Sequence, residues 1–258
     1  MTSVYAHPAA ANYYAGPSHA HQARDRGYRL CDHCSSAESS SGPKFRLCGG
    51  CMTTQYCSQD CQRANWPSHK AICQHTAAQV SAMKQASHHS HHSSSHHSSH
   101  HATEDTIAKC LRKFASAHQT LLSWSTYQAL NVKRLPSNIR TNCLVVDLAY
   151  HGNGAESHRR FSIKSTHILP RTYIIDPLVT ADIQRRDDRC RRLGGIGTAV
   201  VVVQCGGASQ VMPIEIDPPA SIGWDTREDW AGVLGHFVGT GNTDFRPIST
   251  TARGVHYG

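Results

Sequence analysis

The feature that most constrains the fold of this chain is a run of paired cysteines with one histidine near its N-terminus. Eight such residues fall within 43 positions, spaced as Cys-x2-Cys, Cys-x2-Cys, Cys-x3-Cys and His-x3-Cys. Zinc takes four thiolate or imidazole ligands as a tetrahedron, so eight ligands fill two closed sites. A closed site leaves no position for a reacting water and therefore stabilises a fold. The predicted ligands are Cys31, Cys34, Cys48, Cys51, Cys57, Cys61, His69 and Cys73.

Each spacing within this run fits a local backbone shape. A Cys-x2-Cys pair fits a tight turn, and Gly49-Gly50 gives the second such pair backbone freedom to wrap a metal. Cys57 and Cys61 stand four residues apart, as do His69 and Cys73, so each pair shares one face of a helix. The alternative is a set of disulfide-bonded cysteines, which would predict neither the paired spacings nor the histidine.

The segment from Cys31 to Cys73 resembles the MYND-type zinc finger, a small fold with a short hairpin and short helices. The resemblance rests on residues between the predicted ligands as well as on the ligands themselves: Gln55-Tyr56-Cys57-Ser58, Cys61-Gln62, Trp66, His69-Lys70 and Cys73. The resemblance implies that the ligand pairs interleave, with two ligand sets: Cys31, Cys34, Cys57 and Cys61 for one zinc ion, and Cys48, Cys51, His69 and Cys73 for the other. Interleaving would make the finger one cooperative folding unit, because its metal binding free energy is folding free energy.

The same resemblance implies a role in protein interaction. MYND fingers typically bind short proline-containing peptides beside their hairpin, and the matching positions here are Gln62 and Trp66. The strand from Thr53 to Tyr56 is the expected pairing edge for such a peptide. An indole offers proline a flat apolar face, and a strand edge offers backbone hydrogen bonds. The alternative is that Trp66 only covers a zinc site in a module too small for an ordinary core.

Composition divides the rest of the chain around the finger, which we place at residues 28–75. Residues 1–27 have no apolar run and are predicted to form a disordered arm rather than a targeting peptide. Residues 76–103, rich in His and Ser, are predicted to be a flexible linker. Weak metal buffering by its histidines is the alternative. Residues 104–258 are long enough for one domain with its own core.

Hydrophobic periodicity predicts a small α+β fold for residues 104–258. Apolar residues near one face predict a helix over 103–130, with acidic residues at its start. Short strands are predicted at 143–149, 160–164 and 172–176. A hairpin is predicted for 198–205 and 210–216, turning at Gly206-Gly207, with Pro213 placing its second strand at a sheet edge. We expect a covering helix over this sheet.

Charge and cysteine usage limit the choice of partners and compartment. The formal net charge is +8, and seven thiolates with two zinc ions would lower it to about +5. The densest basic segment, residues 185–192, is interrupted by Asp187 and Asp188, which favours a solvated helix with local ion pairs over a nucleic-acid contact. No apolar stretch is long enough to cross a membrane. The other four cysteines show no paired spacing, which indicates a reducing intracellular compartment, nucleus or cytoplasm.

We therefore predict an intracellular adaptor that uses a two-zinc finger to bind proline-containing motifs in partner proteins. The alternative is a lysine methyltransferase-related enzyme, or another enzyme, in residues 104–258. The methyltransferase pattern is incomplete, because residues 24–30 lack a Gly-x-Gly cofactor loop and Asn142-Cys143 is not followed by Pro-Asn. A hydrolase cluster of Cys143, Asp147, His151 and His158 would require these residues to meet in space. We predict no catalytic residue.

Overall fold

The computed structural model describes residues 31–34, 36, 42–43, 45–51, 54–89, 104–152 and 156–257. The N-terminal arm, Thr53 and linker residues 90–103 lie outside this part of the chain. The finger contains a hairpin of β1 (Arg46–Leu47) and β2 (Gln55–Tyr56), followed by α1 (Gln59–His89). The two strands are antiparallel, with Leu47 opposite Gln55. The expected hairpin is therefore present, and the single helix α1, with Pro67 inside it, stands in place of the short helices expected for the finger.

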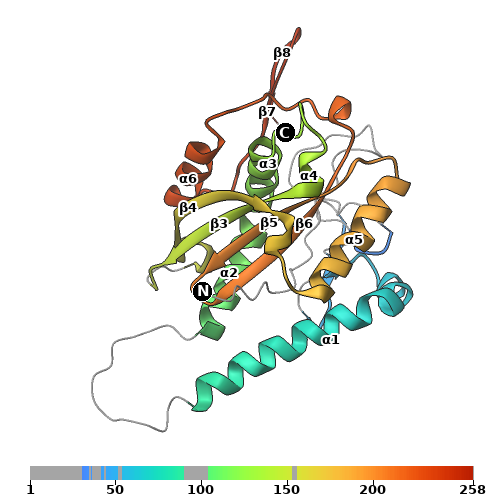
Figure 1. The fold of residues 1–258 in the computed structure, drawn as a ribbon, viewed down its shortest axis with the longest axis vertical. Helices are drawn as coiled ribbons and strands as arrows, with labels where there is room; N and C mark the ends of the chain where they lie inside the picture. The colour runs from blue at the N-terminus through green and yellow to red at the C-terminus, as the bar shows by residue number, and fades with distance from the viewer. Residues whose placement is uncertain are drawn as a thin grey trace.

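Helix α1 continues far beyond the finger (Figure 1). We predicted a flexible linker from residue 76, and this is wrong for residues 76–89, which are helical. Residues 77–86 consist mostly of Ala, Gln, Met and Lys, which have high helix propensity. The run of Ser and His residues that predicted a linker begins only at Ser87.

The C-terminal region is built on a four-stranded mixed sheet with the strand order β4-β3-β5-β6. Its strands are β3 (Asn142–Tyr150), β4 (Phe161–Pro170), β5 (Gly197–Cys205) and β6 (Ala208–Ile216). Strands β3 and β5 are parallel, and the other pairs are antiparallel. Pro213 lies on the edge strand β6, as predicted, because proline lacks the amide hydrogen that an interior strand needs.

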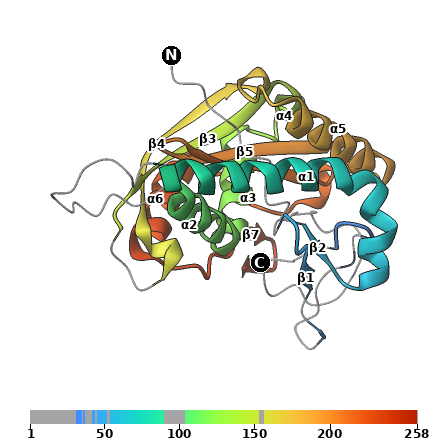
Figure 2. The same ribbon diagram turned by 90° about the horizontal axis from the view of Figure 1, so that it is seen from below.

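Helices cover both faces of this sheet (Figures 1 and 2). One face carries α2 (Glu104–Ala117), α3 (Gln119–Ala129) and α6 (Trp230–Thr240), and the other carries α5 (Pro177–Arg192). The remaining elements are short: α4 (Asn138–Thr141), η2 (Ser157–Arg160), η3 (Arg171–Tyr173), η4 (Pro219–Ser221), β7 (Ile248–Thr251) and β8 (Gly254–Tyr257). The α+β prediction is confirmed, with helices on two faces rather than one.

The sheet separates two apolar clusters because successive side chains of a strand point to opposite faces. On β3, Leu144 and Val146 belong to the larger cluster under α2 and α3, whereas Cys143 and Val145 belong to the smaller cluster under α5. Each of these four side chains is at most 1% exposed. Full burial of such an aliphatic side chain contributes about 1.5–3 kcal/mol, so both faces of the sheet stabilise the fold.

Two predicted elements differ from the structure. The helix predicted over 103–130 is two helices, because His118 departs from helical dihedral angles, with φ −100° and ψ 21°. The strand predicted at 172–176 is a short 3-10 turn, followed by the start of α5. There the Asp176 Oδ1 atom accepts hydrogen bonds from the amides of Leu178 and Val179, at 2.9 and 3.2 Å. An Asp N-cap followed by Pro177 favours a helix start over a strand.

Candidate metal centre

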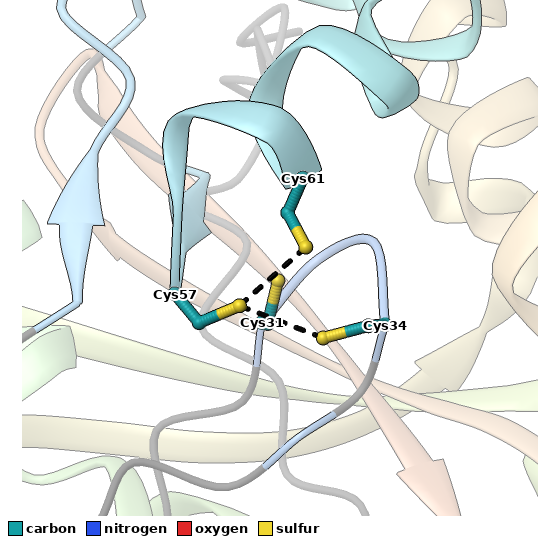
Figure 3. A group of neighbouring side chains, drawn as sticks. All are labelled: Cys31, Cys34, Cys57 and Cys61. Atoms are coloured by element: carbon teal, nitrogen blue, oxygen red, sulfur yellow. Dashed lines mark hydrogen bonds between the residues drawn. The ribbon is translucent and has the colours of Figure 1, made fainter. Parts of the chain in front are cut away.

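The four cysteines Cys31, Cys34, Cys57 and Cys61 lie together as the first cluster of the finger (Figure 3). Two come from the loop before β1, one follows β2, and Cys61 lies in the first turns of α1. The Cys57 Sγ atom is 3.6 Å from that of Cys34 and 3.5 Å from that of Cys61. The Ser58 hydroxyl accepts a hydrogen bond from the Cys61 amide at 3.1 Å, which starts the helix that carries Cys61.

The second cluster contains Cys48, Cys51, His69 and Cys73, all of which are buried. The Sγ atoms of Cys48 and Cys73 are 3.7 Å apart, and the Cys51 Sγ atom is 3.5 Å from Nε2 of His69. Helix α1 supplies His69 and Cys73 from successive turns. The two clusters use alternate pairs along the chain, which is the interleaving that the family resemblance implies.

The spacing of these atoms fits zinc. Zn–S and Zn–N bonds of about 2.3 and 2.0 Å in a tetrahedron place sulfur atoms about 3.8 Å apart, and sulfur and nitrogen about 3.5 Å apart. The distances in both clusters, 3.5 to 3.7 Å, lie close to these values. Within each cluster all four candidate ligand atoms lie within 4.8 Å of one another. Each cluster can therefore hold one zinc ion, whose charge would stabilise the crowded thiolates.

Crowding and burial act on the thiols themselves. Burial, together with the neighbouring thiols, raises the pKa of Cys57 and of Cys73 to about 12. Burial acts to raise the pKa of Cys34, but hydrogen bonds with Ser36, Cys31 and Cys57 together outweigh it and lower the pKa to about 7. Zinc binds the thiolate, so metal binding at these clusters releases protons.

Gly50 and Gly49 provide a matched test of the second cluster. A Cβ atom at Gly50 would lie 2.9 Å from the Cys73 Sγ atom, whereas a Cβ atom at Gly49 would meet nothing within 4 Å. We expect Gly50→Ala to weaken zinc binding by about 10-fold to 100-fold, the usual cost of disturbing a residue that supports a metal ligand. Gly49→Ala should bind zinc like the wild type. Competition with a chromophoric chelator measures both; equal affinities of the two variants would contradict the packing argument.

The two predicted peptide contacts, Gln62 and Trp66, lie four residues apart on α1 and therefore share one face of the helix. Gln62 is half-buried, and Trp66 is 40% exposed. The indole of Trp66 also packs edge-on against the His69 ring, with the ring centroids 6.0 Å apart. Trp66 thus covers part of the second cluster while its remaining surface faces solvent.

The predicted pairing strand for a peptide needs correction. Both backbone groups of Gln55 are already used by Asp32: the Gln55 amide donates to Oδ2 at 2.7 Å, and the Gln55 carbonyl accepts from the Asp32 amide at 2.9 Å. Since these groups point away from β1, the opposite residue Leu47 also directs its amide and carbonyl outward. Among the described residues of the hairpin, the outward backbone groups are therefore those of β1, where Leu47 is 39% exposed.

The residues considered for hydrolase chemistry do not meet. Cys143 is fully buried, and burial raises its pKa to about 11. Asp147 accepts hydrogen bonds from Ser165 and Gln204, whereas His151 contacts Ser162. Asp147 and His151 therefore have different hydrogen-bond partners, and the Cys143 thiol faces the Pro170 carbonyl instead of either of them.

Helix α5 corrects the prediction of a solvated basic face. Arg186 is completely buried, and its Nε donates to Asp182 at 2.5 Å. Arg189 is paired with Glu215, and Arg191 with Asp187, whose side chains are 2.6 Å apart. A buried guanidinium needs a partner, and Arg186 has one in Asp182 on the preceding turn. Asp187 pairs instead with the partly exposed Arg191, and Asp188 is exposed. The local ion pairs were predicted correctly, but their exposure was not.

Sequence reasoning missed Asp32, which lies between two candidate zinc ligands and is only 2% exposed. Its carboxylate also lies 3.4 Å from Arg186, which connects the finger to α5. Burial raises the pKa of Asp32, and the hydrogen bond from the Gln55 amide opposes that shift. No sequence signal distinguishes a buried acidic residue inside a Cys-x2-Cys turn from a solvent-exposed one.

The hairpin, the helix and the two interleaved clusters define a two-site zinc finger. Residues 31–73 match the MYND finger family. SET domain-containing protein 14 of Caenorhabditis elegans, which also carries a MYND finger, is 39% identical over 51 residues. That match covers 20% of this chain and 11% of the relative. No solved structure matches the chain.

None of the helices in the described part of the chain combines the length and hydrophobicity that a membrane span requires.

Proposed function

We propose that the finger holds two structural zinc ions through its eight Cys and His side chains and binds short proline-containing peptides of partner proteins. The observation that carries the peptide proposal is the position of Trp66. Its neighbours Asn65 and His69 are 6% and 1% exposed, yet the Trp66 indole is 40% exposed. A large apolar ring held against a metal cluster binds a partner at low cost in side-chain entropy.

The hairpin supplies a second element of the proposed surface. An extended peptide pairing with β1 would use the outward amide and carbonyl of Leu47, the mode in which a peptide adds a strand to a sheet edge. Gln62, one turn before Trp66 on α1, adds an amide that can bond a peptide backbone. An aromatic face, a strand edge and one amide suit an extended, apolar segment.

The contacts of the basic helix favour a protein partner over nucleic acid. Arg186 and Arg189 are 0% and 15% exposed in their side chains, and each is paired with a carboxylate. Phosphate binding requires accessible cations that can release counterions. The methyltransferase alternative gains little from the relative, because the match covers 11% of that protein.

We expect Trp66→Ala to keep two zinc ions per chain and to lose at least about 10-fold in affinity for proline-containing peptides, as truncation of an aromatic hot spot costs about 2 kcal/mol or more. The measurement selects peptides from a random displayed library with the zinc-loaded full chain. Fluorescence anisotropy then compares the affinity of a selected peptide for the wild type and for the variant.

Ile175→Ala is the matched control, since Ile175 is another exposed apolar side chain, 65% exposed and outside the finger. It should bind the selected peptide as the wild type does. If Trp66→Ala released zinc, the tryptophan would be a structural cover for the second cluster. If selection gave no proline-containing peptides, the proposed ligand class would be wrong.

A further inference from the structure

The loop that carries Cys31 and Cys34 is held from both sides by Asp32. Toward the hairpin, Asp32 pairs with the backbone of Gln55. Toward the C-terminal domain, its carboxylate lies 3.4 Å from Arg186 Nη1, and its backbone carbonyl accepts a hydrogen bond from Arg189 Nη1 at 2.8 Å. One residue of the finger thus contacts two arginines of α5.

The same arginines are anchored within the C-terminal domain. Arg186 donates to Asp182 one turn earlier on α5, and Arg189 Nε donates to Glu215 on the edge strand β6 at 3.1 Å. Glu215 is only 4% exposed. A continuous line of buried or nearly buried charges therefore runs from the finger through α5 to the sheet.

A second contact joins α1 to the other end of α5. His75, which lies on α1 two residues after Cys73, places Nε2 2.8 Å from Oδ2 of Asp176. The other carboxylate oxygen of Asp176 caps the start of α5. The finger and its helix therefore contact α5 at its N-terminal cap and again in its last turns, which fixes the orientation of the helix.

The charges at this interface depend on the finger being in place. Arg186 is 0% exposed and pairs with both Asp32 and Asp182, so loss of the Asp32 carboxylate leaves this buried guanidinium with one partner fewer. Removing one partner from a buried ion pair is costly, because the remaining charge stays desolvated. The loop residues 31–34 form no helix or strand, so their conformation depends on the cluster that Cys31 and Cys34 join.

We propose that α5 of the C-terminal domain is a resident binding partner of the finger, docked on Asp32 through Arg186 and Arg189, and that zinc in the first cluster is required for this docking. The finger then has two faces with different tasks. Asp32 binds the chain's own α5, while Trp66 and Leu47 remain available to another protein. The docking proposal uses different residues from peptide recognition, so either can fail without the other.

Hydrogen exchange of the full chain, measured with zinc and after removal of zinc by a chelator, tests the metal dependence. We expect amides of α5 to exchange at least about 10-fold faster in the metal-free chain, since docking no longer protects them. The exchange rates of the central strands β3 and β5 should change less. Unchanged α5 exchange in a chain that metal analysis shows to be zinc-free would overturn the proposal.

Asp32→Asn tests the contact itself, because asparagine keeps the shape and can still accept from the Gln55 amide but loses the charge facing Arg186. We expect two zinc ions to remain and α5 exchange to rise about 10-fold. Asp60→Asn is the matched control: Asp60 lies in the same finger, pairs with the exposed Arg63, and is 90% exposed. It should leave α5 exchange unchanged, and an Asp32→Asn chain that behaved like this control would contradict the proposal.

A double variant distinguishes the pair from a general loss of stability. If Asp32 and Arg186 interact, Asp32→Asn combined with Arg186→Met accelerates α5 exchange by less than the product of the two single effects, since the second change removes a charge that has already lost its Asp32 partner. This measurement requires only that each variant folds and that peptides from α5 are detected in the exchange experiment. Single effects that multiply would show that the two side chains act independently.

Discussion

Replacing Cys57 with alanine will empty both zinc clusters, although Cys57 belongs to only one of them. Its Sγ atom lies within 3.6 Å of the Sγ atoms of Cys34 and Cys61, so its removal leaves the first cluster with three ligands. Cys48 and Cys51 lie in the chain between Cys34 and Cys57, and the second cluster therefore depends on the loop and hairpin that the first cluster holds. Binding of structural zinc contributes about 10–16 kcal/mol to folding, far more than the hairpin contributes alone.

The measurement is zinc per chain by elemental analysis, with the wild type expected to hold two ions. The matched control is Cys110→Ala, which removes a buried thiol of the larger apolar cluster and should retain both ions. A Cys57→Ala chain that still held one zinc ion would show that the two clusters fold independently. It would then contradict the cooperative unit inferred from interleaving.

Acid will destabilise the C-terminal domain through His118, the buried histidine between α2 and α3. Its side chain is 1% exposed, and neither ring nitrogen has a hydrogen-bond partner among the described residues. Its ring packs against Phe114 at 4.7 Å and faces His158 at 5.8 Å, measured between centroids. Burial, helped by the charge of His158, lowers the pKa of His118 from 6.5 to about 4.

The sign of the pH effect follows from which state binds the proton. Above pH 6.5 the imidazole is neutral in both states and adds no pH dependence. As the pH falls below 6.5, His118 binds a proton in the unfolded chain but stays neutral in the folded chain until the pH nears 4. The free energy of unfolding therefore decreases. The loss ends near pH 4 and totals about 3 kcal/mol, of which about 2 kcal/mol falls between pH 7 and pH 5.

Urea unfolding at these two pH values, followed for wild type and His118→Leu, measures the effect. The variant should lose about 2 kcal/mol less than the wild type on acidification, because leucine cannot be protonated in either state. Contributions that the two proteins share, including those of the finger, cancel in this comparison. His236→Leu removes an exposed imidazole, and this variant should lose as much stability on acidification as the wild type. Equal losses for His118→Leu and wild type would show that His118 is protonated in the folded state.

The metal clusters were predictable because their ligands are recognised by residue type and by spacing over a few positions of the sequence. Cys-x2-Cys and the four-residue spacings specify turns and helical faces within a few residues of each ligand. Strand positions in the C-terminal domain were also largely predictable, since a continuous apolar run such as residues 143–146 of β3 is typical of a strand buried on both faces. The start of α5 was missed because the cap at Asp176 and Pro177 outweighed the β-branched residues before it.

Sequence alone determined the family of the finger, its two candidate zinc clusters and the edge position of Pro213, because each depends on neighbours along the chain or on a backbone group that proline lacks. Only the tertiary structure decided that Arg186 of α5 is buried and that Asp32 faces it. Periodicity and charge pattern describe one element at a time, whereas the burial of Arg186 depends on a loop 154 positions away in the sequence. Contacts between distant segments form through packing, and no local pattern encodes them.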